Sequence, residues 1–257
     1  MRIIISPAKK MRMDTDSVPV QALPDFLPET ERLLAVLRAM SPKELQAMWK
    51  CNDSIAALNV ERLAAMDLRR CLTPAVLSYE GIQYQYMAPG VFETEQYDFI
   101  QEHLRIVSGF YGLLRPFDGV TPYRLEMQAK LEVCGAKNLY SYWDTLIADS
   151  IFQETDLVVD LASAEYGVCV SRHRPPDARI LTCMFGEKVG DRVLEKGTLC
   201  KMARGEMVRF MAENRVSSPE ELKSFARLGY RFSPEDSGED TYVFLLEPDI
   251  KERAWEA

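Results

Sequence analysis

The sequence has 257 residues and contains no apolar run long enough to cross a membrane. A spanning helix needs about 20 consecutive apolar residues. The chain also lacks the charged and then apolar amino-terminal stretch that is typical of a secretory leader. We therefore expect a cytoplasmic protein that has no membrane partner and no obligate protein partner.

Histidine and closely spaced cysteine are scarce. The two histidines are His103 and His173, and the six cysteines include no C-x-x-C pair. Zinc and non-haem iron sites usually need imidazole or paired thiolate ligands. The sequence thus predicts no bound metal and no cofactor. The cysteines are expected to be reduced and mostly buried: Cys51, Cys71, Cys134, Cys169, Cys183 and Cys200.

Standard catalytic motifs are also missing. The chain has no Walker phosphate loop, no G-x-G-x-x-G turn, no G-x-S-x-G elbow and no H-E-x-x-H pair. This excludes several common enzyme classes but not enzymes in general. If they converge, eleven polar residues would provide the groups for acid–base catalysis on a nucleotide-like or nucleobase substrate: Ser6, Lys9, Asp118, Tyr123, Arg124, Glu126, Lys137, Asn138, Ser163, Glu165 and Tyr166.

The net charge of −8 opposes binding to DNA, because contacts with phosphate require cations. The charges are segregated along the sequence, however. Basic residues cluster at 2–12 and 192–215, whereas acidic residues dominate from 235 to 256. We therefore expect a basic face and a solvated acidic face on opposite sides of the molecule.

Residues 108–127 read Ser-Gly-Phe-Tyr-Gly-Leu-Leu-Arg-Pro-Phe-Asp-Gly-Val-Thr-Pro-Tyr-Arg-Leu-Glu-Met, which we call the signature loop. Its glycines and prolines fix an irregular backbone, while Arg115, Asp118, Arg124 and Glu126 supply opposite charges at close spacing. This composition favours a binding site, since ordered loops on a rigid scaffold often bind ligands. The alternative is a rigid connector whose charges only neutralise one another.

The hydrophobic pattern predicts a mixed α/β fold in which a single domain spans residues 1–257, with a central mixed sheet and flanking helices. Residues 2–5 are apolar and precede Ser6-Pro7, which indicates a strand buried on both faces with Lys9 and Lys10 beyond its carboxyl end. Ligands bind at this end of open α/β sheets. We expect further strands at 157–161, 168–170, 180–185, 230–232 and 242–246, and helices at 28–40, 99–107, 141–151 and 218–228.

Two more helices are expected on either side of residues 50–54. Ser41-Pro-Lys-Glu44 forms a capping box for the first, which contains Leu45 and Trp49, and the second contains Ile55, Leu58, Arg62 and Leu63. This arrangement resembles a helix-hairpin-helix module, whose hairpin amides bind a DNA phosphate without reading sequence. The hairpin lacks the usual glycines, although Asn52 and Asp53 tolerate a left-handed backbone. An ordinary helical hairpin is the alternative.

The predicted helix at 199–214 separates its residues by face. At about 100° per residue, one side has apolar side chains, and the other has Lys201, Arg204 and Arg215 around the small residues Gly205 and Ala212. Cations beside small residues leave room for an anionic backbone. We therefore interpret this face as anion-binding. Glu206 lies among the apolar residues and would need a partner, for which Arg124 and Lys137 are candidates.

Six segments of the chain together resemble the YaaA family of bacterial peroxide-stress proteins. They are residues 5–10, 79–86, 108–127, 137–143, 161–166 and 201–210, in this order and almost end to end. The resemblance implies a cytoplasmic protein that limits peroxide damage and is linked to intracellular iron. It also implies a single compact α/β body that binds DNA through a basic cleft.

Two functions follow as alternatives. The first is largely sequence-independent binding of double-stranded or structured DNA, and the second is an enzyme with a polar pocket for a nucleotide-like compound. A long channel flanked by Lys9, Lys50 and Lys201 would favour the first, and a closed pocket around Lys137 and Glu126 the second. Iron binding by carboxylates is a third interpretation, but the chain lacks the paired E-x-x-H pattern. The residues expected to contact DNA are Lys9, Lys10, Lys50, Asn52, Arg62, Arg115, Arg124, Lys137, Lys201, Arg204 and Arg209.

Overall fold

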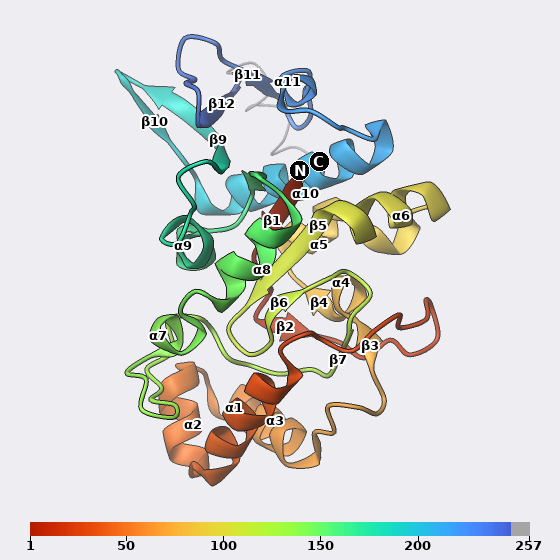
Figure 1. The fold of residues 1–257 in the computed structure, drawn as a ribbon, viewed down its shortest axis with the longest axis vertical. Coiled ribbons are helices and arrows are strands. Elements are labelled where there is room, and N and C mark those ends of the chain that lie inside the picture. The colour runs from red at the N-terminus through yellow and green to blue at the C-terminus, as the bar shows by residue number, and fades with distance from the viewer. Residues whose placement is uncertain (248–257) are drawn as a thin grey trace.

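The first strand of the chain, β1 (Arg2–Ile5), lies in the interior of an eight-stranded sheet (Figure 1). The structure, a computed structural model, describes residues 1–247. β1 pairs in parallel with β5 (Leu104–Ser108) on one side and with β8 (Leu157–Asp160) on the other. Its three isoleucines are fully buried. The predicted strand with two buried faces is therefore confirmed, and its apolar run reflects helices on both sides of the sheet.

The sheet continues from this parallel centre to two antiparallel edges, in the order β11-β12-β9-β8-β1-β5-β6. β9 pairs in parallel with β8 and β12, while β11 and β6 run antiparallel to their neighbours. The prediction of a mixed sheet is thus confirmed. The remaining strands are β6 (Gly112–Leu114), β9 (Arg179–Val189), β10 (Arg192–Leu194), β11 (Tyr230–Phe232) and β12 (Thr241–Leu246).

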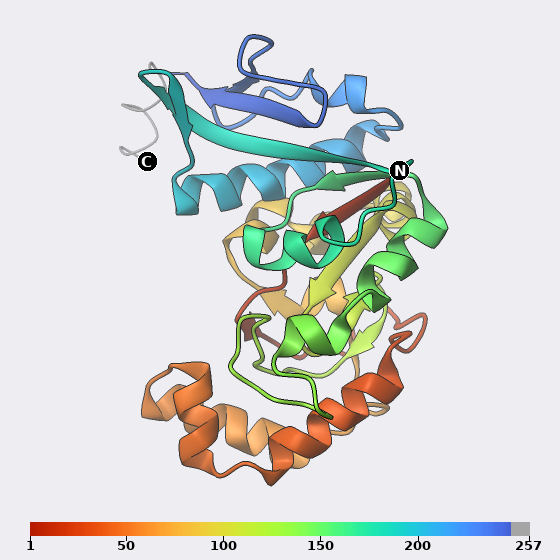
Figure 2. The same cartoon turned by 60° about the vertical axis from the view of Figure 1, so that its left-hand side comes forward.

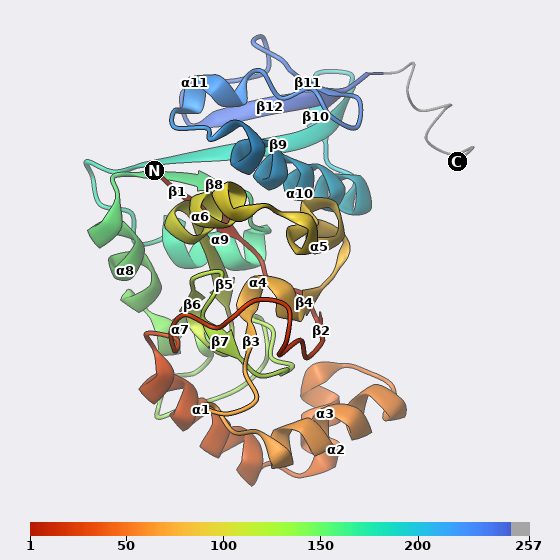
Figure 3. The same ribbon diagram turned by 90° about the vertical axis from the view of Figure 1, so that its right-hand side faces the viewer.

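Helices cover both faces of the sheet. α9 (Ala164–Ser171) lies in front of β1 in Figure 2, and α8 (Leu146–Glu154) packs against α9 and β6. α5 (Ile82–Met87) and α6 (Thr94–His103) cover the opposite face in Figure 3. The long α10 (Gly197–Asn214) packs against α5 and β9. The shorter elements are α4 (Ala75–Ser78), α7 (Leu139–Trp143), α11 (Pro219–Leu222), a 3₁₀ turn (Pro89–Val91) and the two-stranded pairs β2 (Lys10–Met11) with β4 (Tyr79–Glu80) and β3 (Thr73–Pro74) with β7 (Gly119–Val120).

Three helices gather at the end of the molecule farthest from β9–β12 (Figure 3). They are α1 (Leu27–Ala39), α2 (Pro42–Trp49) and α3 (Asp53–Ala65). The predicted capping box of Ser41 and Glu44 is present at the start of α2. Their buried leucines belong to the same hydrophobic core as β1 and β12. The chain accordingly forms one compact α/β domain, within which no helix of residues 1–247 is both long and apolar enough to span a membrane.

Four of the expected elements differ in the structure. Residues 104–107 belong to β5 rather than to a helix, because Leu104–Ser108 is a fully buried run between two strands. Residues 168–170 lie in α9 rather than in a strand, since a short apolar run fits both states. The helix predicted at 141–151 is divided into α7, which Asn138 caps, and α8. The helix predicted at 218–228 is limited to α11.

Candidate functional site

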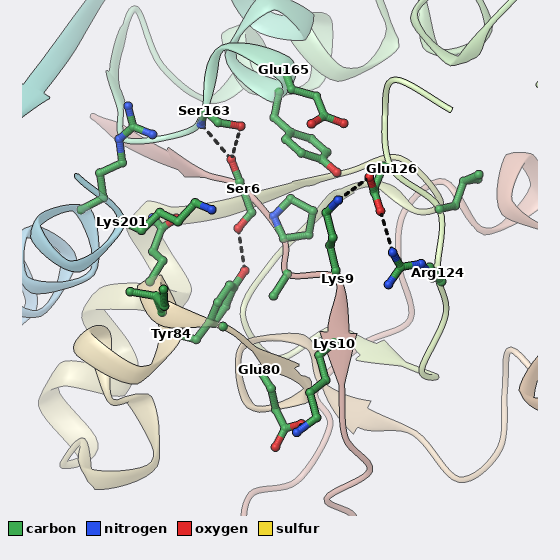
Figure 4. Close-up of a pocket in the computed structure, with 18 of the residues that line it drawn as sticks. Ser6, Lys9, Lys10, Glu80, Tyr84, Arg124, Glu126, Ser163, Glu165 and Lys201 are labelled. Atoms are coloured by element: carbon green, nitrogen blue, oxygen red, sulfur yellow. Dashed lines mark hydrogen bonds and ion pairs between the residues drawn. The ribbon is translucent and has the colours of Figure 1, made fainter. Parts of the chain in front are cut away.

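A cavity of about 380 Å³ lies at the carboxyl ends of β1 and β8, the position expected for a ligand in an open α/β sheet (Figure 4). Five cations and three carboxylates line it, which makes this hollow locally positive in a chain of net charge −8. The cations are Lys9, Lys10, Arg124, Lys201 and Arg204, and the carboxylates are Glu80, Glu126 and Glu165.

The floor of the cavity is fixed by Ser6, directly after β1. The Ser6 hydroxyl accepts a hydrogen bond from the Ser163 backbone N–H at 2.8 Å and donates to the Ser163 hydroxyl at 3.2 Å. The Tyr84 hydroxyl donates to the Ser6 carbonyl at 2.9 Å. These bonds tie the end of β1 to α9 and α5, which places the following Lys9 and Lys10 on the rim (Figure 4).

Glu126 lies between two of the cations. Its Oε2 is 2.8 Å from Lys9 Nζ, and its Oε1 is 3.4 Å from Arg124 Nη2. The side chain of Arg124 is only 11% exposed, whereas that of Lys9 is 67% exposed. Lys10 makes a similar rim pair with Glu80 at 2.9 Å. The Lys9–Glu126 pair thus joins the signature loop to the segment after β1, and the Arg124–Glu126 pair lies within the loop.

α10 contributes the cations on the opposite wall. Lys201 is exposed and makes no hydrogen bond or ion pair with any residue in 1–247. Arg204 is 14% exposed and pairs through Nη2 with Glu195 Oε1 at 3.3 Å, while its buried Nε has no partner in the described chain. A guanidinium with an unpaired buried N–H is poorly satisfied. This wall therefore retains capacity for an anion.

The small residues of α10 do not serve the purpose expected from the sequence. A Cβ at Gly205 would lie 2.2 Å from the Gln83 carbonyl oxygen and 2.9 Å from the Met87 nitrogen. Gly205 and Ala212 are buried. The space beside Gly205 is occupied by α5, so the prediction that it leaves room for an anionic backbone is wrong. Glu206 also has a different partner, Arg227, at 3.1 Å.

Buried hydroxyl and carboxyl groups surround the cavity. Burial raises the pKa of Tyr84, Tyr123 and Tyr166, so that all three remain neutral hydroxyl groups at physiological pH. Burial also raises the pKa of Asp160, at the end of β8, to about 6, although the nearby Arg204 opposes the shift. Asp160 accepts a bond from the Ala162 N–H at 2.8 Å and thereby shapes the turn that leads to Ser163.

Several predicted residues lie outside the cavity. Arg115 pairs with Asp25 at 3.3 Å, and Arg209 pairs with Glu213 at 2.7 Å. Lys137 and Asn138 line a neighbouring hollow beside residues 127–132. Asp118 is buried elsewhere in the signature loop, where it accepts the Arg115 N–H at 2.8 Å. The structure thus brings together Lys9, Lys10, Arg124, Lys201 and Arg204 from the expected DNA contacts, but not the other six.

Three of the six expected DNA contacts outside the cavity lie in the hairpin formed by α2 and α3. Lys50 has the left-handed backbone and is exposed, with no side-chain partner in the described residues. Asn52 caps α3 by accepting the Ile55 N–H at 3.0 Å. Arg62 donates to the Met11 carbonyl at 3.2 Å, which attaches α3 to the segment that contains Lys9 and Lys10. Arg124 reaches the same hairpin from the cavity through the Trp49 carbonyl, at 3.3 Å.

Part of the acidic carboxyl-terminal region is paired with bases. Asp236 contacts Lys188 at 2.7 Å, and Asp240 contacts Arg179 at 3.4 Å. The acidic residues at 249–256, which were expected to form part of the acidic face, lie outside the described residues. This region belongs to the β9–β12 end of the molecule, which is remote from the hairpin (Figure 3).

Sequence reasoning did not identify Glu80, Gln83 and Tyr84 as site residues, although they line the cavity. They lie in the segment 79–86, which was noted for family resemblance but not for chemistry. Five of the six segments that resemble the YaaA family contribute residues to this cavity. The sixth, residues 137–143, lines the neighbouring hollow. No group of three or more histidine, cysteine, aspartate or glutamate side chains suited to a metal was found within residues 1–247.

Comparison with known sequences agrees with this convergence. Residues 1–236 match the family described as Peroxide stress protein YaaA. The chain belongs to the YaaA family. A UPF0246 protein of Lachnoclostridium phytofermentans is 51% identical over 254 residues, which cover 98% of this chain and 100% of that protein. Another UPF0246 protein, from Agathobacter rectalis, is 52% identical over 244 residues, 95% of this chain and 98% of the relative.

Membership in the YaaA family supports a role in the response to peroxide stress. A third relative, the UPF0246 protein of Pediococcus pentosaceus, is 48% identical over 245 residues and covers 95% of this chain. The similarity in each case extends over almost the whole domain. The cavity and the three-helix end of the molecule therefore both belong to the part shared with the YaaA family.

Proposed function

We propose that this protein binds DNA largely without sequence preference during peroxide stress, and that its cavity cations contact the phosphate backbone. The observation that supports this most is the set of five lysine and arginine side chains around one hollow, among which Lys201 has no partner in the described residues. Contacts of this kind position DNA but do not read its bases.

The paired cations of the cavity fit this proposal as well. Lys9 and Lys10 are largely exposed and are bound only to rim carboxylates, at 2.8 and 2.9 Å. Exposed ion pairs contribute about 0–1 kcal/mol, so a phosphate can replace such a carboxylate partner at small cost. The cost is larger for Arg124, which is mostly buried.

The α2–α3 hairpin supplies a second group of contacts in this proposal. Its three-residue turn at 50–52 is short, Lys50 projects as an unpaired cation, and the first N–H groups of α3 point out of the helix. Arg124 and Arg62 fix the hairpin to the cavity rim. In this proposal one duplex contacts both groups.

We extend the proposal to iron-linked damage. Phosphate oxygens are hard ligands that attract iron cations to DNA, where peroxide then generates oxidants close to the bases. A protein that occupies the phosphates with lysine and arginine side chains competes with this binding. Its protective effect should therefore depend on the same cations as its affinity for DNA.

The test compares charge-reversal variants in a titration of labelled duplex DNA at two salt concentrations. Lys50→Glu with Lys201→Glu should weaken binding at least tenfold and lower the salt slope by about two, because two phosphate contacts are lost. Both side chains are exposed and unpaired within residues 1–247, so the fold should be unchanged. Arg172→Glu, also exposed and away from the cavity, is the control.

Binding that is absent at low salt, or that is the same at both salt concentrations, would contradict the proposal. So would a double variant that folds and binds DNA as well as the parent. Comparing duplex, single-stranded and junction DNA in the same assay identifies the preferred DNA structure.

An enzyme that acts on a nucleotide-like compound is the second candidate. The observation that favours it is the cavity itself, which encloses Lys9, Glu126, Glu165 and Tyr166 in a volume typical of small-molecule sites, about 300–1,000 Å³. Incubation with deoxynucleotides or oligonucleotides, followed by chromatography, would show product formation. Activity that survives Glu126→Gln and Glu165→Gln would exclude this cavity as the active site.

A further inference from the structure

The two walls of the cavity differ in chemistry. Lys201 and Arg204 line the cavity from α10. Glu126 lies across the cavity from Lys201, between Lys9 and Arg124 (Figure 4). The α10 wall offers hydrogen-bond donors that have no partner in the described residues. The wall around Glu126 offers donors and acceptors that are already held in ion pairs. A ligand that complements both must be anionic at one end and neutral and polar at the other.

The anionic end has a defined place. Lys201 has no partner within the described residues, and Arg204 has an unpaired Nε. The Ser163 side chain makes no capping bond to α9, while the Ser163 carbonyl accepts the N–H groups of Tyr166 and Gly167. The N–H groups of Ala164 and Glu165 are thus left without an acceptor within the helix. These donors lie near the hydroxyls of Ser6 and Ser163, which are 3.2 Å apart. Such a combination of donors suits a phosphate monoester or diester.

The lining between these polar groups is largely apolar. Tyr84, Tyr166, Ile82 and Leu125 line the space between the two polar walls. The carboxylate of Glu165 accepts the Gln128 N–H through Oε1 at 3.1 Å, and its Oε2 makes no hydrogen bond to residues 1–247. A free carboxylate oxygen beside an apolar floor suits a flat ring that has amino or ring N–H donors. A nucleobase has this form.

We propose that the cavity binds one nucleoside 5′-phosphate unit, with its phosphate at Lys201, Arg204 and Ser163 and its base towards Glu126 and Glu165. The unit is either a free nucleotide or one unpaired nucleotide displaced from a DNA strand. The second source rests on the proposed DNA binding, because the cavity would then receive a base from a duplex held by the surrounding cations. Extrusion costs a few kcal/mol and is cheapest for a base that is already unpaired.

The experiment measures affinity for four probes: inorganic phosphate, dGMP, a fully paired duplex and the same duplex with one unpaired nucleotide. Two variants act on the cavity. Lys201→Gln removes the unpaired cation, and Ile82→Trp fills the space between the walls. Arg172→Gln is the matched control, because Arg172 is exposed and lies outside the cavity. Lys201→Gln is expected to fold normally and provides the test if Ile82→Trp does not fold.

We expect the parent protein to bind the duplex with one unpaired nucleotide at least tenfold more tightly than the fully paired duplex. Lys201→Gln and Ile82→Trp should reduce this difference in affinity, and Arg172→Gln should not. If the gain is absent but dGMP binds more tightly than phosphate and loses affinity in Lys201→Gln, the free nucleotide is the source. If neither dGMP nor the unpaired nucleotide is preferred, the inference is overturned. Binding of the fully paired duplex is judged separately, so failure of the DNA-binding proposal is distinguishable from failure of this one.

Discussion

Arg124 of the signature loop donates a hydrogen bond from Nη2 to the carbonyl oxygen of Trp49 at 3.3 Å. Trp49 is the last residue of α2 and is 5% exposed. The same guanidinium nitrogen lies 3.4 Å from Glu126 Oε1 in the cavity. One side chain thus connects the cavity wall with the helical hairpin, and any ligand that draws Arg124 towards itself must also weaken its bond to the hairpin.

Replacing Arg124 by alanine should lower the free energy of unfolding by about 1–3 kcal/mol, because the variant leaves Glu126 and the Trp49 carbonyl with fewer donors. Chemical denaturation of the parent and the variant measures this difference. Arg172→Ala removes an exposed arginine whose side chain has no hydrogen bond or ion pair within residues 1–247, and it should change stability by less than about 0.5 kcal/mol. Equal effects of the two substitutions would show that the Arg124 contacts contribute nothing specific.

Replacing Gly205 by alanine should destabilise the protein by about 1–3 kcal/mol or more, since the new methyl group meets the α5 backbone. Gly197 is a matched control in the same helix, because a Cβ there has no neighbour within 4 Å. Gly197→Ala should leave stability unchanged or raise it by up to about 1 kcal/mol. Thermal unfolding of both variants distinguishes steric conflict from helix propensity, and a stable Gly205→Ala variant would require a different packing of α5 on α10.

The buried Asp118 should make stability depend on pH. It is 2% exposed, and burial raises its pKa to about 7, against about 3.9 in an unfolded chain. The folded state therefore retains a proton that the unfolded state loses, and the free energy of unfolding falls as pH rises from about 4 to about 7. Between pH 5 and pH 8 the fall due to Asp118 should be about 2–3 kcal/mol, at about 1.4 kcal/mol per pH unit.

Asp118→Asn tests this dependence, because asparagine can still accept the Arg115 N–H but does not ionise. The stability of the variant relative to the parent should increase by the same amount between pH 5 and pH 8. Asp236→Asn is the control, since hydrogen bonds from Lys188 and Ser233 lower the pKa of Asp236 out of this range. A constant difference for Asp118→Asn across the range would show that Asp118 is already ionised at pH 5.

The cysteines should react with thiol reagents in an order set by burial. Cys71 and Cys134 are exposed, whereas Cys169, Cys183 and Cys200 are buried. Burial raises the pKa of Cys169 and Cys200 to about 12, which keeps both as unreactive thiols. Brief treatment of the native protein with iodoacetamide, followed by mass spectrometry, should modify Cys71 and Cys134 first. Early modification of Cys183 would reveal local opening of the sheet, and denatured protein provides the reference for full labelling.

The sequence predicted the parts of the fold that depend on local pattern. The apolar run of β1, the capping box at Ser41 and the last two strands, β11 and β12, all occur as expected. The prediction failed where a short apolar run is compatible with either a helix or a strand, as at 168–170. Whether such a run forms a helix or a strand depends on how it packs on the sheet, which the local pattern does not show. The sequence also predicted that the six cysteines are mostly buried. Three of them are buried, but Cys51 is half-buried and Cys71 and Cys134 are exposed.

The candidate site was predicted only in part, for a similar reason. Lys9 was predicted from the carboxyl end of the strand at 2–5, Arg124 from the signature loop, and Lys201 and Arg204 from the basic face of the helix at 199–214. All four line the cavity. The sequence could not show that α5 fills the space at Gly205, since that contact joins segments more than a hundred residues apart. Nor could it separate Arg115 from the site, because Arg115 shares the signature loop with Arg124 and differs only in where the loop turns.

The place of β1 in the sheet has a consequence for how the chain folds during synthesis. β1 is made first, yet its neighbours β5 and β8 begin about 100 and 150 residues later. Until the ribosome has released residues 157–160, one edge of this apolar strand has no partner. Contacts between residues so far apart in sequence form slowly, and until they form the unpaired strand edges are exposed and prone to aggregation. The nascent chain should therefore depend on chaperones most strongly during the interval before β8 emerges.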